Sequence, residues 1–245
     1  MMKKLIAILV IAVSMSLFSA EKYAVLIAGD YNATGISTTS QWNQGLGDHS
    51  EFWNDLYLQW EMLYQKGYKK ENIKVLFAKG SDYWIDNSYV ANRYRAYNAT
   101  GTLLETITNY AATEANVQAV CAELGSKMVY GDDFLYVWVM SHSSSGSIYL
   151  MNDALSGNVA VSYSTFANYF KPLNALNKVY QLNINYAKNL ELQLQQENAV
   201  IISSSDYLQG IENSYRADNK ILEIDKGPGD VMAPILNTAF FRRMC

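Results

Sequence analysis

One of the two histidines stands directly behind the strongest strand pattern of the sequence. The apolar run 134–140 ends at Ser141, and His142 then leads into a serine-rich loop at 143–146. Ligands of open α/β sheets bind beyond the carboxyl ends of strands. An imidazole held there by a rigid strand suits a general base, because it titrates near neutral pH. The alternative is that His142 only ends the strand through a backbone hydrogen bond.

Strand and helix patterns alternate along the chain and must position this histidine. The predicted strands are 23–28, 73–77, 134–140, 179–184 and 199–202, and the predicted helices are 52–66, 117–124, 164–170 and 231–241. Residues 80–112 are rich in Tyr, Asn and Thr, which predicts an irregular excursion. The alternation predicts an α/β three-layer sandwich, a mostly parallel sheet with helices on both faces, in one domain over 21–245.

The first twenty residues differ in kind from the rest. Two lysines precede an apolar run from Leu5 to Leu17. The small residues Ser19 and Ala20 follow it and could form a cleavage site. This pattern is typical of a secretory signal peptide, and the run is too short to span a bilayer comfortably. We therefore expect residues 1–20 to be removed on export to the periplasm or the extracellular space. Phe18 is unusual three positions before the expected cut, so the exact position of the cut stays open. An uncleaved N-terminal anchor is the alternative.

The composition argues against several function classes. The chain has 245 residues and a formal net charge of −4, which argues against a nucleic-acid surface. Two cysteines and two histidines cannot form a disulfide framework or a multi-histidine metal site. No phosphate-binding loop, dinucleotide fingerprint or zinc motif is present. We expect no metal, no cofactor, no nucleic-acid partner and no membrane contact once the leader is removed.

The order of these features resembles that of the caspase-like cysteine peptidases of the legumain type. In that family one strand ends in a short turn that contains the catalytic His, and a later strand ends in a turn that begins with the nucleophilic Cys. In this sequence His142 and Asn185 stand at those two positions. Two further regions are similar to bacterial members of the family. The first resembles their first helix and second strand, and it comprises 52–68, which begins with Phe-Trp-Asn-Asp and ends with Gly-Tyr, then Glu-Asn-Ile at 71–73 and Val-Leu at 75–76. The second resembles the strand after the nucleophile and the segment that follows it, and it comprises 198–205 and Glu-Asn-Ser-Tyr at 212–215. The resemblance covers most of 22–241 and implies a caspase-like sandwich that acts on a polypeptide.

Two departures from the family pattern bear on the chemistry. The nucleophile position holds Asn185, whose carboxamide has no thiolate-like form and cannot attack a peptide bond. The glycine whose backbone N–H helps to bind the oxyanion is replaced by Ser143, which keeps the N–H but loses the close backbone approach of glycine. Loss of a nucleophile costs about a million-fold in turnover, so we expect a pseudopeptidase.

Other residues are poor substitutes for the missing nucleophile. Cys121 lies on the apolar stripe of a predicted helix, which favours a packing role, and Cys245 is the last residue. The serines at 143–145 and 203–205 lack the Gly-x-Ser-x-Gly pattern and are typical of loops and turns.

His49 is a weaker candidate for substrate binding. It stands beside Asp48 at the start of the first predicted helix, and the corresponding loop of legumain-like enzymes helps to form the substrate pocket. The alternative is an ordinary exposed helix N-terminus. The aromatic residues of 83–97 either line a groove or cover the core.

Three hypotheses remain open from the sequence. The first is an exported caspase-fold pseudopeptidase that binds a polypeptide substrate or a protein partner. The second is an active cysteine endopeptidase of the same family that recruits a different residue. The third is an unrelated exported α/β binding domain in which His142 has a structural role.

Overall fold

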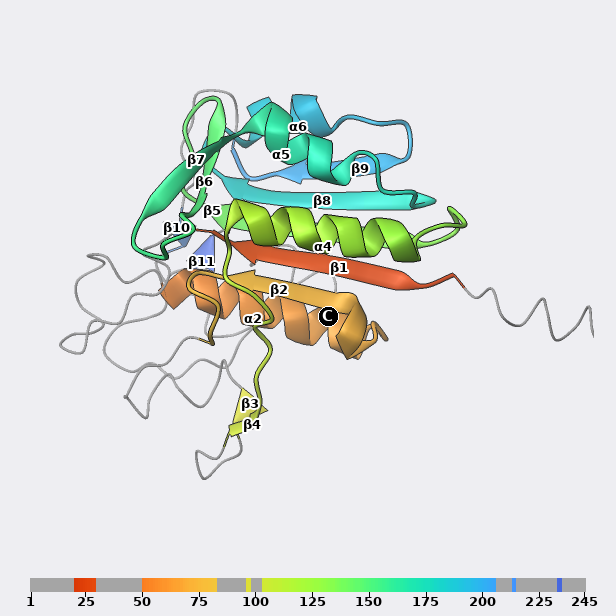
Figure 1. Ribbon diagram of the computed structural model, residues 1–245, viewed down its shortest axis with the longest axis horizontal. Helices are drawn as coiled ribbons and strands as arrows, with labels where there is room; N and C mark the ends of the chain where they lie inside the picture. Colours follow the sequence, from red (N-terminus) through yellow and green to blue (C-terminus); the bar gives the residue numbers. More distant parts are fainter. Residues whose placement is uncertain are drawn as a thin grey trace, which may run out of the picture.

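A parallel β-sheet organises the part of the chain that the computed structural model describes, which is residues 20–29, 50–82, 96–97, 103–205, 213–214 and 233–234 (Figure 1). Its strands are β1 (Lys22–Ala28), β2 (Ile73–Phe77), β5 (Phe134–Ser141), β8 (Asn177–Ile184) and β9 (Ala199–Ser203). They pair in the order β2-β1-β5-β8-β9, and every pair is parallel. The central strands β1, β5 and β8 are buried along most of their length, as continuous apolar runs predict.

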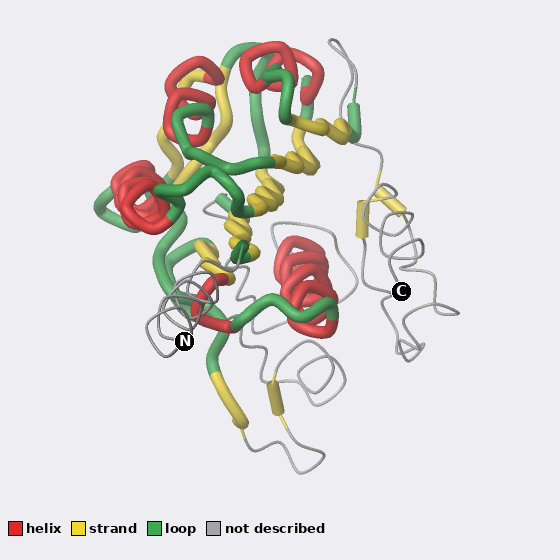
Figure 2. The backbone as a smooth tube through the Cα atoms, turned by 90° about the vertical axis from the view of Figure 1, so that its right-hand side faces the viewer, coloured by secondary structure: helices red, strands yellow, loops and turns green. Residues whose placement is uncertain are grey.

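Helices cover both faces of this sheet (Figure 2). Helix α2 (Ser50–Gln65) packs on one face, and α4 (Glu114–Lys127), α5 (Tyr163–Phe170) and α6 (Ala187–Leu194) pack on the other. Alternate residues of each strand serve the two faces, so Val25 and Ile27 face α4 while Leu26 faces α2. The protein is therefore a three-layer α/β sandwich, which confirms the fold class expected from the sequence.

Smaller elements complete the described structure. They are the short helix η2 (Lys70–Asn72), the hairpin of β6 (Ser147–Met151) and β7 (Asn158–Ser162), and the short strands β3 (Ala96–Tyr97), β4 (Leu103–Glu105), β10 (Asn213–Ser214) and β11 (Ala233–Pro234). No helix in the described ranges is both long and apolar enough to cross a membrane.

The sequence patterns predicted the main strands and helices to within a few residues, with three exceptions. The expected helix over 231–241 is wrong at Ala233–Pro234, which pairs with Asn213–Ser214. Proline disfavours helical backbone in the residue before it, which explains this error. Helix α6 and the β6–β7 hairpin were not predicted at all.

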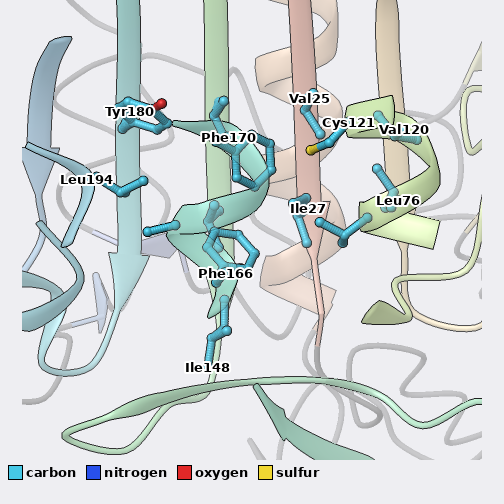
Figure 3. Close-up of a cluster of buried hydrophobic side chains, with 14 of the residues drawn as sticks. Val25, Ile27, Leu76, Val120, Cys121, Ile148, Phe166, Phe170, Tyr180 and Leu194 are labelled. Carbon is cyan, nitrogen blue, oxygen red and sulfur yellow. The ribbon is translucent and has the colours of Figure 1, made fainter. Parts of the chain in front are cut away.

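The two layers of the core differ in polarity. The α4 side is a continuous apolar cluster that includes Phe166, Phe170 and Cys121 (Figure 3). On the α2 side the hydroxyl of Tyr136 lies 2.9 Å from Gln59 Oε1 and 2.8 Å from Gln181 Oε1, and all three residues are buried. Burial raises the pKa of Tyr136 well above its ordinary value. This group ties α2 to β5 and β8 by polar contacts, so it restricts how α2 can sit on the sheet.

Gly29, directly after β1, allows the sheet and the β6–β7 hairpin to approach closely. A Cβ atom at this position would lie 2.8 Å from the carbonyl oxygen of Tyr149 and 2.6 Å from Leu150 Cδ2. Backbone cannot yield as a flexible side chain can, so any larger residue must displace the hairpin.

We expect Gly29→Ala to lower the free energy of unfolding by about 1–3 kcal/mol, because overpacking forces backbone shifts. Gly125→Ala is the matched control. Gly125 is exposed within α4, and its added Cβ would meet only Leu173 Cδ2, at 3.7 Å. At Gly125 the same change should raise the free energy of unfolding by about 0.5–1 kcal/mol, because alanine favours helical backbone more than glycine does. Urea denaturation of both variants measures the difference, and equal effects would contradict this account.

Candidate functional site

His142 and Asn185 follow a paired position of two neighbouring strands. β5 and β8 run parallel, and the last pair of their register joins Ser141 to Ile184. The residue that follows this pair is therefore His142 in the chain of β5 and Asn185 in the chain of β8. The structure thus brings together, at the carboxyl edge of the sheet, the two positions that the sequence places far apart.

Hydrogen bonds hold the two turns against each other. Ser143 Oγ donates to the carbonyl oxygen of Asn185 at 2.6 Å. The Tyr163 hydroxyl lies 2.7 Å from the carbonyl oxygen of Ser144 and 3.2 Å from that of Asn185. Asn189 Nδ2 donates to the carbonyl oxygen of Ser145 at 2.9 Å. The turn after β5 and the turn after β8 consequently form one connected unit.

The backbone N–H of Ser143 points away from the β6–β7 hairpin. Hydrogen bonds from Tyr149 N to His142 O at 3.0 Å, and from Ser144 N to Ser147 O at 2.8 Å, flank an antiparallel bridge between Ser143 and Ile148. In such a bridge the N–H of the central residue points away from the partner strand. Among the described residues it meets no hydrogen-bond acceptor, and Ser143 itself is buried, with 8% of its surface exposed.

The side chain of His142 is exposed and lies beside the first turn of α2. Its ring centroid is 5.8 Å from that of Phe52, with the ring planes at 52°. Phe52 is buried, so the aromatic contact limits the positions of the imidazole while leaving it accessible to solvent. The ring is therefore not a buried core group.

Asn185 stands at the start of α6. The residue after it, Tyr186, has a left-handed backbone conformation with φ 53°, and the helix begins at Ala187. The N–H of Ala187 donates to Ser205 Oγ at 2.9 Å. A helix N-terminus carries partial positive charge, which lowers the pKa of a cysteine thiol placed beside it. This backbone would thus suit a thiolate, although the residue present has none.

Among the other candidates from the sequence, Ser205 reaches this group, because its Oγ accepts a hydrogen bond from the N–H of Ala187 at 2.9 Å. His49, Cys245 and most of the aromatic excursion lie outside the described residues. The serines at 203–205 have structural partners: Ser203 Oγ donates to Glu191 Oε2 at 2.8 Å, and Ser205 Oγ donates to Ile184 O at 2.8 Å. No three His, Cys, Asp or Glu side chains come together as a possible metal site in the described part of the chain.

Sequence reasoning missed Tyr163 and Asn189, which link the two turns. Tyr163 is one of nineteen tyrosines and carries no distinguishing motif. Its role depends on the capped start of α5, where the Ser162 side chain accepts from the N–H of Thr165. The Ser162 cap before a helical pattern is the one local signal that places Tyr163 at a helix start.

Cys121 cannot act as the nucleophile. It lies on α4 within the apolar cluster, with 5% of its surface exposed (Figure 3). Burial raises the pKa of its thiol to about 12, so the reactive thiolate is absent at neutral pH.

We expect the native Cys245→Ser variant to resist a thiol reagent at pH 8, and to react with one equivalent after unfolding in urea. The physical reason is that Cys121 is both inaccessible and protonated in the folded protein. Absorbance of the released aromatic thiol measures the reaction. The double variant with Cys121→Ala is the blank, and rapid labelling of the folded single variant would show that this thiol is accessible.

Comparisons with known proteins give no close relative. No family model matches the sequence, and no curated protein matches it. Among solved structures, Raptor from Chaetomium thermophilum aligns at 8% identity with a TM-score of 0.42. That alignment covers 78% of this chain and 16% of the Raptor chain, so this chain corresponds to a small part of that protein. A likeness at this level identifies neither a family nor a function.

Proposed function

We propose that this protein is an exported caspase-like pseudopeptidase of the legumain type, which binds a polypeptide at the carboxyl edge of its sheet without cleaving it. One observation carries the proposal: His142 and Asn185 directly follow a paired position of two adjacent parallel strands. That is the relation that the resemblance requires of the catalytic base and the nucleophile.

The groups at this edge suit the recognition of a peptide backbone. The N–H of Ser143 can donate to a peptide carbonyl oxygen, and the carboxamide of Asn185 offers both donors and an acceptor. The exposed imidazole of His142 can donate to or accept from the same peptide. The hydrogen bonds between the two turns limit the rearrangement needed for binding, which lowers the entropic cost.

Cleavage is not supported, because no suitable nucleophile lies beside the histidine in the described structure. The carboxamide of Asn185 cannot attack a carbonyl carbon. Ser143 Oγ is committed to the carbonyl oxygen of Asn185 at 2.6 Å, and Cys121 is in the core. The base and the oxyanion donor therefore remain without a reacting group.

Replacement of Asn185 by cysteine tests the proposal directly. In a Cys245→Ser background, we expect Asn185→Cys to react with iodoacetamide at about pH 6, since a neighbouring imidazolium and a helix N-terminus stabilise the thiolate. The rate of alkylation as a function of pH, followed by mass spectrometry, measures this. The buried Cys121 contributes no background in the folded protein.

The control adds His142→Ala to the same variant. Without the imidazole the thiol should react only near its ordinary pKa of about 8.5. If the two pH profiles coincide, the histidine does not face position 185 and the proposed site is absent. Asn185→Ser serves as a second control, because a hydroxyl at this position should show no alkylation in the same range.

The parent protein distinguishes the proposal from an active peptidase. We expect no turnover of a mixed peptide library by the parent chain, and measurable cleavage by Asn185→Cys. Cleavage by the parent that disappears in His142→Ala would instead establish an active enzyme with a different nucleophile. Mass spectrometry of the peptide products provides the measurement.

A further inference from the structure

Two tyrosines, Tyr149 and Tyr186, flank the candidate site and have no part in the contacts described above. Tyr149 lies on β6, and Tyr186 directly follows Asn185. Both are half-buried, and neither belongs to the apolar clusters of the core. Within the described ranges, neither hydroxyl makes a hydrogen bond and neither ring contacts another aromatic ring. The packing of the described residues therefore does not account for these two side chains.

Tyr149 stands beside His142. Ser143 and Ile148 form an antiparallel bridge. The next pair along it joins His142 to Tyr149, whose N–H donates to His142 O at 3.0 Å. Directly opposite residues project their side chains from the same face, with Cβ atoms about 5 Å apart. The bridge pair is buried, whereas His142 is exposed and Tyr149 is half-buried, so this second pair faces outward.

Tyr186 adopts a backbone conformation that is unusual for a bulky residue. Its φ of 53° and ψ of 33° lie in the left-handed region, which favours glycine and asparagine. The Tyr186 side chain makes no capping hydrogen bond to α6, so helix capping does not explain the choice of residue. Strained backbone of this kind is concentrated at ligand sites, which makes Tyr186 a candidate for contact with a ligand.

The two tyrosines lie close to the contacts that join the turns. The Tyr163 hydroxyl bonds the carbonyl oxygens of Ser144 and Asn185. Burial is the main reason why the pKa of Tyr163 rises to about 12, and the phenol groups of Tyr149 and Tyr186 contribute to the rise. Ionisable groups affect a pKa in this way over short distances. Both phenol groups are therefore near the junction of the turn after β5 with the turn after β8.

The charged groups beside Asn185 are already engaged with each other. Lys188, in the first turn of α6, forms an ion pair with Glu191. Ser203 Oγ donates to the second carboxylate oxygen of Glu191 at 2.8 Å. An acidic ligand side chain would have to compete with Glu191 for Lys188, which disfavours it. Tyrosine rings, in contrast, contact apolar side chains and keep a hydroxyl for the peptide backbone.

We propose that Tyr149 and Tyr186 determine which polypeptide the site accepts. The ligand is an extended segment whose large apolar or aromatic side chains pack against the two rings, one on the β6 side of His142 and one on the α6 side of Asn185. This inference rests on the proposed function, because it takes a polypeptide as the ligand of the carboxyl edge. It adds the class of side chain that the polypeptide carries.

Selection from two peptide libraries by the full-length chain tests the inference. One library carries leucine, phenylalanine or tyrosine at alternate positions, and the other carries aspartate or glutamate there. We expect the parent to retain the apolar library about tenfold better, and Tyr149→Ala or Tyr186→Ala to reduce that retention about tenfold. Tyr130→Ala is the matched control, because Tyr130 is 68% exposed before β5 at the opposite edge. Equilibrium dialysis with mass spectrometry measures retention.

Two further variants separate contact with the ligand from a structural role. Glycine adopts left-handed backbone without strain, so Tyr186→Gly should unfold at the same urea concentration as the parent or a higher one. Its retention of the apolar library should nevertheless fall as in Tyr186→Ala. Tyr149→Phe keeps the ring and should retain the library as the parent does, even if Tyr149→Ala unfolds the hairpin.

Three results would overturn the inference. Equal retention of both libraries by the parent, or unchanged retention in the alanine variants, would remove the selectivity and leave polypeptide binding in place. A lower urea midpoint for Tyr186→Gly would assign the ring to the stability of the fold. Retention of neither library would contradict polypeptide binding as well. Alkylation of Asn185→Cys tests the arrangement of His142 and position 185 without any peptide, so the two failures are distinguishable.

Discussion

The in-register pairing of β5 with β8 is the constraint on which the rest of the structure depends. Tyr180, Leu182 and Ile184 of β8 join the apolar cluster beneath α5 and α6, and Gln181 and Asn183 alternate with them. A slip of one residue would exchange these sets and bury polar side chains in the apolar cluster. The core therefore fixes the register of β5 and β8. This register in turn decides that His142 and Asn185 lie next to each other beyond the two strands.

The contrast between the two faces of the sheet extends this control to the site. The α4 side is held mainly by apolar packing, to which the buried Lys178 adds hydrogen bonds from Nζ to Lys171 O at 2.7 Å and to Gln196 Oε1 at 2.9 Å. The α2 side contains the buried contacts of Tyr136 with Gln59 and Gln181, which have strict requirements for distance and direction. These contacts limit the position of α2, whose first turn carries Phe52 against the His142 ring. The imidazole is thus positioned by a helix as well as by its own strand.

A parallel sheet also separates the residues that precede its strands from those that follow them. All strands enter at one edge and leave at the other, so residues before strands and residues after strands never mix. The polar turns that follow β5 and β8 meet at the carboxyl edge. The exposed apolar residues Val129 and Tyr130, before β5, and Leu176, before β8, lie toward the amino edge. The common direction of the strands therefore decides which residues lie at each edge.

The sequence by itself determined the fold class and most elements, because continuous apolar runs and helical spacing are local properties. It also marked His142 and Asn185 as strand-end residues, and the resemblance to a peptidase family supplied their expected relation. It could not reveal α6, whose buried stripe is only Ala187, Leu190 and Leu194, nor the β6–β7 hairpin, which depends on contacts with Gly29 and Ser143. Only the tertiary structure decided the strand order, the links through Tyr163 and Asn189, and the direction of the Ser143 N–H. These depend on contacts between distant segments, and no local pattern in a single chain encodes them.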